Sequence, residues 1–362
     1  MQNATMSSPS VEAQTIKIQC YHLEEEWSHT RETFITNVIL IVVNLLTSVT
    51  STAGNILVIM AVKRTRSLRT PSNTLLCSLA LSDLLVGAIV QPMYALQMIF
   101  EIRRNSDGFC IAKITTTGSL AWVCAGVSFL VISAISVERL LAIKLHLRYK
   151  ALVTIPRVLT VVMFFWVLCT ALIMARLLGA PYNILVLTIF VMDVNSIAIV
   201  IFAYSSIYHQ VRKLQNKTRD QRHLAPPGIN IHSFKRSAVT MLYVIVLFLA
   251  CYIPFITTLV VRLLEGGSLW LNIIYKITAS IVYINSSLNP FVYCFRSKEV
   301  RTAIFKLLGR KYTLDKNGDF IPVSKYGTQN LKTYAVKNLT IFPSGYFQHS
   351  LNQLSNLPET QV

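Results

Sequence analysis

The chain has 362 residues, of which 53% are hydrophobic and only 14% charged, and its mean hydropathy is +0.52. This composition excludes an ordinary soluble globular protein and predicts a polytopic membrane protein. The formal net charge of +18 does not indicate nucleic-acid binding, because the basic residues are divided among short connections and no soluble domain carries them.

Seven apolar runs follow one another along the chain, and each reaches or approaches the ~20 residues that a helix needs to cross a bilayer. They are residues 33–62, 71–100, 114–137, 158–175, 177–208, 237–261 and 266–295. The sequence therefore predicts an all-α membrane protein built as a seven-transmembrane helix bundle. We expect four parts: an N-terminal segment 1–33, a seven-helix domain 34–296, a surface helix 297–310 and a tail 311–362.

Lys and Arg are unevenly divided between the two sets of connections. With the N-terminus outside, 25 basic residues face the cytoplasm, Arg139 left aside, and six face the exterior. Because Lys and Arg are in excess on the cytoplasmic side, we expect a plasma-membrane protein with an extracellular N-terminus and a cytoplasmic C-terminus. The basic connections would then face anionic lipid. No cleavable signal peptide is expected, since residues 1–33 lack an apolar core, and Asn3 begins the glycosylation sequon on the outer side.

Six landmarks occur inside or directly at the end of six of the runs. In chain order they are Gly54-Asn55, Ser82-Asp83, Glu138-Arg139-Leu140, Trp166, Cys251-Tyr252-Ile253-Pro254 and Asn289-Pro290-Phe291-Val292-Tyr293. Together and in this order they resemble the rhodopsin-like family of G-protein-coupled receptors over roughly residues 34–310. The very short connection after the fourth helix is loosely similar to that of melanocortin, adenosine, cannabinoid and lysophospholipid receptors.

The resemblance implies a receptor that passes an extracellular signal to a heterotrimeric G-protein through outward movement of the sixth helix. It implies no enzymatic activity, no covalently bound cofactor, and arrestin as a further partner. Two alternatives stay open. One is a decoy receptor that binds its ligand without signalling, and the other is a transporter or channel whose path is lined by Asp83, Arg176 and Asp193.

Asp83 is an ionisable residue near the bilayer midplane and needs a partner or a proton there. In the family this aspartate joins a sodium site, and the matching positions here are Ser128, Asn285, Ser286 and Asn289, with Asn55 bracing them. Carboxylate, hydroxyl and amide oxygens suit a hard cation. We therefore expect an allosteric sodium ion, and the alternative is a hydrogen-bonded polar core that holds water and no ion.

The resemblance also implies an activation switch. Its members are Glu138, Arg139, Tyr204, Tyr252, Pro254, Pro290 and Tyr293. Arg139 would be held by Glu138 and released toward the G-protein, although an arginine at a helix end can also simply reach the headgroups. A proline inside a helix removes a backbone hydrogen bond and favours a kink. The sequence departs from the family at Tyr252, where tryptophan is usual, and at Leu140, where tyrosine is usual.

The usual extracellular disulfide of the family has no counterpart, since Ile114 occupies its third-helix position. Of the seven cysteines, Cys20 and Cys110 are the two that the predicted topology places on the oxidising side. We expect them to pair, and the alternative is that both stay free thiols.

The predicted ligand pocket contains aromatic, amide and charged residues: Gln91, Tyr94, Gln97, Trp122, Arg176, Asp193, Tyr252, Arg262, Tyr275, Lys276 and Tyr283. The cations Arg176, Arg262 and Lys276 could receive a carboxylate or phosphate, with aromatic walls around an apolar body. Alternatively, Arg262 and Lys276 lie at the membrane surface, and Asp193 pairs with Arg176. The ligand could be a small lipid, a nucleoside or a peptide.

Residues 297–310 place Val300, Ile304, Leu307 and Leu308 on one helical face, as in a helix that lies on the membrane surface. The polar tail 311–362 is expected to be disordered. It ends in Glu359-Thr360-Gln361-Val362, a form that PDZ domains bind, so Thr360 and Val362 are a candidate PDZ ligand that can also arise by chance.

Overall fold

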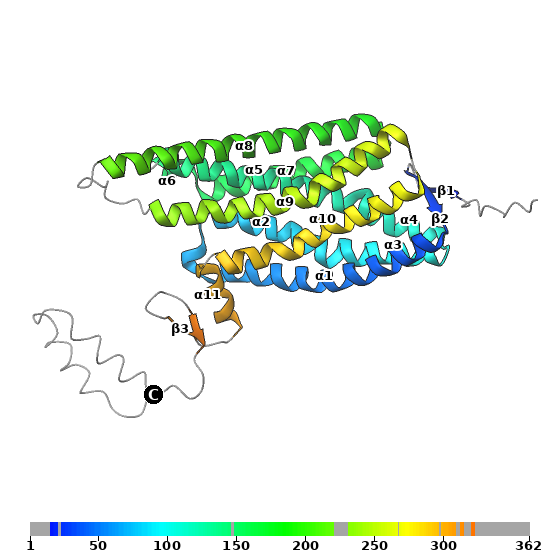
Figure 1. The fold of residues 1–362 in the computed structure, drawn as a ribbon, viewed down its shortest axis with the longest axis horizontal. Helices are drawn as coiled ribbons and strands as arrows, with labels where there is room; N and C mark the ends of the chain where they lie inside the picture. The colour runs from blue at the N-terminus through cyan, green and yellow to red at the C-terminus, as the bar shows by residue number, and fades with distance from the viewer. Residues whose placement is uncertain are drawn as a thin grey trace, which may run out of the picture. The chain divides into compact units, whose positions relative to one another are not determined.

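The computed structural model describes residues 15–308, apart from 21–22, 146–147, 221–230, 267 and 297, together with residues 312–314 and 320–322. The chain forms two compact units, Met1–Leu307 and Leu308–Val362. All of the long helices belong to the first unit, where α1 lies on one side and α8 on the other (Figure 1).

The described part of the first unit contains seven helical segments long enough to cross a membrane. They are α1 (Arg31–Arg64), α2–η2–α3 (Pro71–Leu85, Val86–Val90, Gln91–Ile102), α4–η3–α5 (Ser106–Thr115, Thr116–Leu120, Ala121–Leu145), α7 (Ile155–Leu177), α8 (Tyr182–Asp220), α9 (Ile231–Glu265) and α10 (Leu269–Arg296). Short helices η1 (Arg66–Leu68) and α6 (Tyr149–Leu152) lie in two of the connections. The predicted all-α bundle is confirmed.

The first six of these segments also have the hydropathy of a membrane span. The seventh, α10, is 28 residues long, which is about 42 Å at ~1.5 Å per residue. It carries polar residues in its second half, including Asn285 and Asn289, both of which are buried. Its lower hydropathy therefore reflects groups that face the bundle interior.

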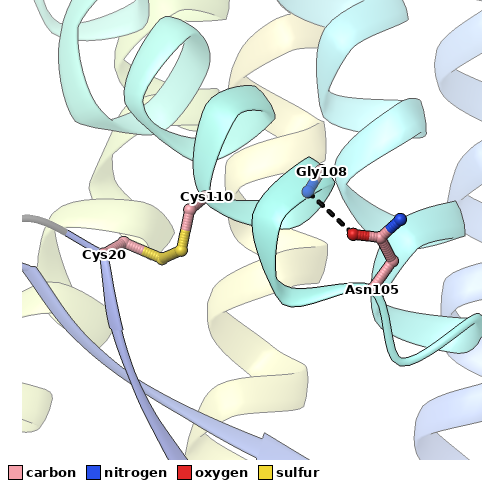
Figure 2. The surroundings of a disulfide bond; sticks show 4 residues. All are labelled: Cys20, Asn105, Gly108 and Cys110. Carbon is pink, nitrogen blue, oxygen red and sulfur yellow. Dashed lines mark hydrogen bonds between the residues drawn. A yellow bond between two sulfur atoms is a disulfide. The ribbon is translucent and has the colours of Figure 1, made fainter.

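The third segment begins at Ser106, eight residues before the predicted start at Ile114. The side chain of Asn105 caps this helix, since its Oδ1 accepts a hydrogen bond of 2.9 Å from the backbone N–H of Gly108 (Figure 2). The prediction relied on the absence of charge, but helix starts depend on capping residues, and Lys113 is buried within this helix.

Two helix ends require glycine. Gly179 follows α7 with φ of 97°, and Gly266 follows α9 with φ of 81°. Both lie in the left-handed region that glycine enters without steric cost, which is how many helices terminate. These residues fix where the fourth and sixth segments stop.

Helix α5 lies inside the bundle and packs against α2, α7 and α8, while α10 packs against α1 and α9. One large cluster of buried apolar side chains joins all of these helices. The outer faces of α1, α7 and α8 instead expose large apolar residues such as Leu46, Val167 and Phe202. Such faces are expected where lipid replaces water.

The second and third segments each contain one wider helical turn, at η2 (Val86–Val90) and η3 (Thr116–Leu120). Such turns leave backbone carbonyls without their usual partners. The Oγ of Ser48 in α1 donates a 2.7 Å hydrogen bond to the carbonyl of Gly87 in η2. This contact ties α1 to the second segment at that point.

The N-terminal segment contains a β-hairpin, which was not predicted. Strand β1 (Thr15–Cys20) pairs antiparallel with β2 (Leu23–Ser28), so that Cys20 lies opposite Leu23. A disulfide joins Cys20 to Cys110 of α4, with 5.1 Å between their Cα atoms (Figure 2). Trp27 and Phe109 pack edge to face beside it, with ring centroids 5.0 Å apart. The hairpin is thereby fastened to the third segment.

Helix α11 (Lys298–Leu307) follows α10 and buries Val300, Ala303 and Ile304. In the second unit, β3 (Tyr312–Leu314) pairs antiparallel with β4 (Phe320–Pro322). These six residues depart from the disordered tail predicted for 311–362, because the aromatic and β-branched residues in the two stretches favour a strand pair. Asn3, Thr360 and Val362 lie outside the described residues.

Candidate functional site

Helices α5, α7, α8 and α9 surround a cavity of about 510 Å³. Its walls are largely apolar and aromatic, and four predicted pocket residues line it: Trp122, Arg176, Asp193 and Tyr252. The volume lies within the ~300–1,000 Å³ that is usual for small-molecule sites. The arrangement can enclose a ligand with an apolar body.

An aromatic group lies at the Tyr252 side of the cavity. The ring of Tyr252 stacks on Phe248 at 4.1 Å between centroids and meets Phe129 edge to face at 4.9 Å. Phe129 belongs to α5, whereas the other two belong to α9. A ligand that displaced Tyr252 would therefore change the packing between α5 and α9 directly.

Arg176 and Asp193 contribute charge to the cavity from α7 and α8, respectively. Both side chains are partly buried. Oδ1 of Asp193 is buried and has no hydrogen-bond partner among the residues that the structure describes. Ion pairs seen among the described residues include Arg139–Glu138 and Lys276–Glu101, and an Arg176–Asp193 pair stays a prediction.

Other predicted pocket residues lie apart from this cavity. Tyr275 and Tyr283 line a small neighbouring cavity of about 30 Å³, together with Trp122 and Tyr252. The guanidinium of Arg262 lies 4.6 Å from the ring centroid of Tyr275. This contact is typical of a cation–π interaction.

Three further candidates form hydrogen bonds within the bundle. Gln91 is fully buried, and its Nε2 donates a 2.7 Å hydrogen bond to Oγ1 of Thr47 in α1. Oε1 of Gln97 accepts a 3.1 Å hydrogen bond from Thr116. The hydroxyl of Tyr94 donates to the carbonyl of Lys276 at 3.4 Å. These hydrogen bonds connect different helical segments, and the three residues do not line the large cavity.

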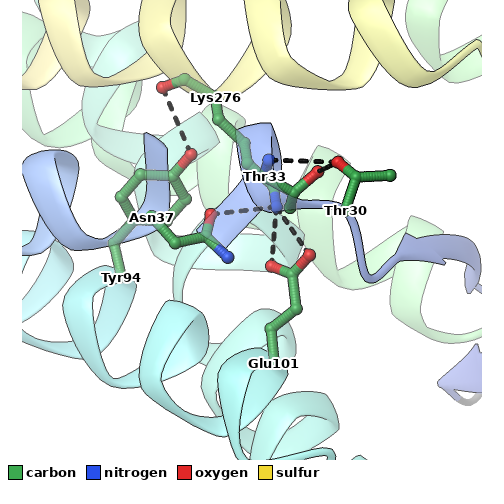
Figure 3. A network of polar contacts seen from close by, with 6 residues as sticks. All are labelled: Thr30, Thr33, Asn37, Tyr94, Glu101 and Lys276. Atoms are coloured by element: carbon green, nitrogen blue, oxygen red, sulfur yellow. Dashed lines mark hydrogen bonds and ion pairs between the residues drawn. The ribbon is translucent and has the colours of Figure 1, made fainter. Parts of the chain in front are cut away.

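Lys276 takes part in a polar network near the hairpin (Figure 3). Its Nζ lies 2.6 and 2.7 Å from the two carboxylate oxygens of Glu101 in α3, and it donates a 3.1 Å hydrogen bond to Oδ1 of Asn37 in α1. Glu101 is only 3% exposed. The lysine that was predicted to receive an anionic ligand already has an anionic partner within the protein.

Sequence reasoning did not select Glu101 as a site residue. The sequence does contain a signal for this ion pair. Glu101 lies at the end of the second run and Lys276 near the start of the seventh, and these two ends lie on the same side of a membrane. Opposite charges at one level of a bundle are candidates for an ion pair. A partner of this kind can be sought before a ligand is assigned.

The predicted polar core is brought together around Asp83, which is 3% exposed. Asn289 Nδ2 donates a 2.7 Å hydrogen bond to Asp83 Oδ2. Asn55 Nδ2 donates to the carbonyl of Ser286 at 3.1 Å. Ser128 contacts Ser82 at 3.0 Å and joins the core through that serine.

Three amide oxygens at the predicted core positions, those of Asn55, Asn285 and Asn289, are buried and have no hydrogen-bond partner among the described residues. Oxygens in this condition fit a hard cation or an ordered water. These oxygen atoms are therefore compatible with the predicted sodium ion.

Glu138 and Arg139 lie near the other end of the bundle, within α5. Nε of Arg139 is 3.4 Å from Glu138 Oε2, close enough for an ion pair although the geometry is not that of a hydrogen bond. Oε1 of Glu138 accepts a 2.6 Å hydrogen bond from Ser72 in α2 and a short one from the hydroxyl of Tyr149 in α6. Burial, and then the hydrogen bond to Glu138, raise the pKa of Tyr149 above its usual value, so the hydroxyl stays a donor.

Ser72 and Tyr149 were not predicted. They can be called the Glu138 clamp, since both hold the same carboxylate oxygen. Their positions in α2 and in the connection after α5 carry no motif, so the sequence offers no local signal. The remaining switch tyrosines, Tyr204 and Tyr293, have buried hydroxyls without a hydrogen-bond partner among the described residues. Pro254 and Pro290 lie inside α9 and α10.

The sequence of the chain was compared with those of known proteins, and it matches one family. The chain matches the family described as "7 transmembrane receptor (rhodopsin family)" over residues 54–184 and 179–293. It is 30% identical to the growth hormone secretagogue receptor type 1 of Oryctolagus cuniculus over 289 residues. It is 28% identical to the receptors of the same name from Mustela putorius furo and Homo sapiens over 287 residues. Each alignment covers 71% of this chain and 77% of the relative.

Proposed function

Since this chain belongs to the rhodopsin family of seven-transmembrane receptors, we propose that it transmits the binding of an extracellular ligand to a heterotrimeric G-protein. The observation that carries the proposal is the pairing of two sites in one bundle. A ligand-sized cavity lies between α5, α7, α8 and α9, and the Glu138–Arg139 pair lies further along the same α5. A multi-pass membrane protein with this arrangement can connect events on the two sides of a bilayer.

The connection runs through α5 and α9. Tyr252 lines the cavity and packs against Phe129 and Phe248. A ligand that contacts Tyr252 can therefore change the packing between α5 and α9. Pro254 lies one turn or less from Tyr252 and removes a backbone hydrogen bond from α9. In the proposed mechanism the ligand favours a state in which the inner part of α9 moves outward and Arg139 leaves Glu138.

The proposed orientation places the hairpin outside the cell and α11 at the inner face of the plasma membrane. The excess of Lys and Arg in the connections at the α11 end supports it. A disulfide at the hairpin end agrees with this assignment, because disulfides persist in oxidising compartments. The G-protein, and arrestin as a further partner, would then meet the end that carries Arg139.

The test is activation of a panel of G-protein sensors in cells that express the chain or its Arg139→Ala variant. The probes are libraries of lipids, nucleosides, amines and peptides, and basal activity is recorded as well. We expect a signal from the parent chain that falls at least about tenfold in the variant at matched surface expression, as for loss of ~1.4 kcal/mol of coupling. Arg103→Ala removes a similar charge from an exposed site at the hairpin end and should leave the signal unchanged.

Two results would count against the proposal. A chain at the surface that binds a library member and activates no sensor would be a decoy receptor. Currents or solute uptake in cells without G-proteins would favour the transporter or channel alternative.

A further inference from the structure

Asp193 is the carboxylate of the large cavity, and it lies among aromatic and aliphatic side chains. Its Oδ1 is buried, and no described residue donates a hydrogen bond to it. A buried carboxylate without a donor carries a large desolvation cost. The same side chain lines the cavity of about 510 Å³, so a donor placed there lies beside the carboxylate.

A ligand that fills the cavity comes to lie beside this carboxylate. If its group beside Asp193 were apolar or anionic, the carboxylate would still lack a donor and its desolvation cost would remain. A cationic donor supplies the missing hydrogen bond as a charge-assisted pair. The chemistry at this point therefore selects among ligands more strongly than the apolar walls do.

The aromatic residues of the cavity also favour a cationic ligand group. Phe129 and Tyr252 form the edge-to-face pair described above, and Trp122 and Phe255 lie 6.0 Å apart between ring centroids. All four line the cavity. The face of an aromatic ring attracts a cation, and more strongly where water is excluded.

Resting on the proposed receptor function, we infer that the natural ligand carries a cationic amine or guanidinium group at its inner end, which pairs with Asp193 among these aromatic rings. The body of the ligand is apolar and extends toward Arg176. The assignment is a binding site for a cation on α8, the fifth membrane segment.

Arg176 gives the ligand one orientation. It lies one residue before the end of α7, whereas Asp193 lies eleven residues after the start of α8, and a short connection joins these two ends. At ~1.5 Å per residue, the two Cα atoms are offset by roughly 15 Å along the helices. A ligand cation placed beside Arg176 would be repelled, so the cation points inward and a neutral or anionic group faces Arg176.

The experiment measures binding directly, without a G-protein. The purified chain in lipid nanodiscs is titrated with phenylbutylamine, phenylbutanol or phenylbutyric acid, three probes that share one apolar body, and its unfolding temperature is followed. We expect the amine to bind the parent chain at least tenfold more tightly than the other two. Asp193→Asn, which keeps the shape of the side chain, should weaken the amine by roughly ten- to a hundredfold, as for loss of a hydrogen bond to a charged group.

Two further variants serve as controls. Asp193→Glu retains the charge and should keep a preference for the amine. Asp107→Asn makes the same chemical change at an exposed residue of α4, outside the cavity, and should bind as the parent does. The inference is overturned if the parent prefers the alcohol or the acid, if it binds all three probes alike, or if Asp193→Asn leaves the amine unaffected. Because no G-protein takes part, failure here is distinct from failure of the sensor assay with Arg139→Ala.

Discussion

At the scale of single residues, Glu138 is held on both carboxylate oxygens. Ser72 and Tyr149 donate to Oε1, while Oε2 faces Arg139. A carboxylate fixed in this way keeps its second oxygen directed at the arginine. The hold on Arg139 therefore depends on residues in α2 and α6 as well as on its neighbour in sequence.

Tyr149→Phe removes one donor to Glu138 and keeps the ring. We expect basal G-protein signalling to rise several-fold, because loss of a hydrogen bond to a charged group, about 1.5–3 kcal/mol, frees Glu138 and with it Arg139. Sensor output without ligand, normalised to surface expression, measures the effect. Tyr208→Phe makes the same change at an exposed residue of α8 and should not alter it. Unchanged or lower basal output in Tyr149→Phe would show that the clamp does not restrain Arg139.

The polar core around Asp83 leads to a prediction about sodium. Purified parent chain should unfold at a higher temperature in sodium chloride than in choline chloride of equal concentration, because a bound ion stabilises the folded state by mass action. Asp83→Asn should abolish the difference, since it removes the charged ligand while keeping a partner for Asn289. Asp107→Asn should retain it. An equal sodium effect in Asp83→Asn would favour a core that holds water alone.

At the scale of elements, the close approach of α1 to α10 depends on Gly54. A Cβ atom at this position would lie 2.9 Å from Cβ and Cγ of Pro290. The proline ring cannot rotate away, so any larger residue would have to push the two helices apart. Asn55, the next residue, donates to the carbonyl of Ser286 across the same interface.

Gly54→Ala should therefore destabilise the bundle by about 1–3 kcal/mol, the usual cost of an overpacked contact. The unfolding temperature of the purified chain measures this. Gly126→Ala offers a graded control, because its added Cβ would meet Sγ of Cys169 at 3.0 Å, and a thiol at the end of a side chain can move. If Gly54→Ala and Gly126→Ala had the same unfolding temperature, the contact between α1 and α10 would be looser than the structure indicates.

At the scale of the whole molecule, Glu101 and Lys276 connect segments that are far apart in sequence. The pair joins α3 to α10, and Asn37 adds α1. The disulfide between β1 and α4 lies at this end of the bundle as well, where Figure 1 shows β1, α3 and α4 close together. At this end an ion pair and a hydrogen bond join the first, second and seventh segments, and a disulfide joins the hairpin to the third, while the α9 side is left to move in the proposed mechanism.

Removing one member of the ion pair should be costly. Lys276→Met or Glu101→Gln should each destabilise the bundle by about 3–5 kcal/mol, since a buried charge loses its partner, whereas the double substitution should cost less than the sum of the two. Unfolding temperatures of the four proteins complete the double-mutant cycle. Additive effects would contradict the coupling that the 2.6 Å contact implies.

The sequence by itself determined the class of fold and the motifs. Apolar runs of bilayer length follow from the need to satisfy backbone groups within each helix, so length and hydropathy alone identify them. The family resemblance also grouped Asp83 with Asn289, and the structure joins them by a hydrogen bond, as expected for polar residues inside such runs. The helix ends were less accurate, as at Ser106, since capping by Asn105 is a local contact that hydropathy does not report.

Only the tertiary structure decided how the charged residues are used. It placed Lys276 on Glu101, gave Glu138 its donors Ser72 and Tyr149, and left Asp193 in a cavity without a donor among the described residues. A charged side chain in the sequence has many candidate partners within its reach. Which partner it finds depends on how neighbouring helices are rotated and how deep they lie, and those quantities are set by the packing of the whole bundle.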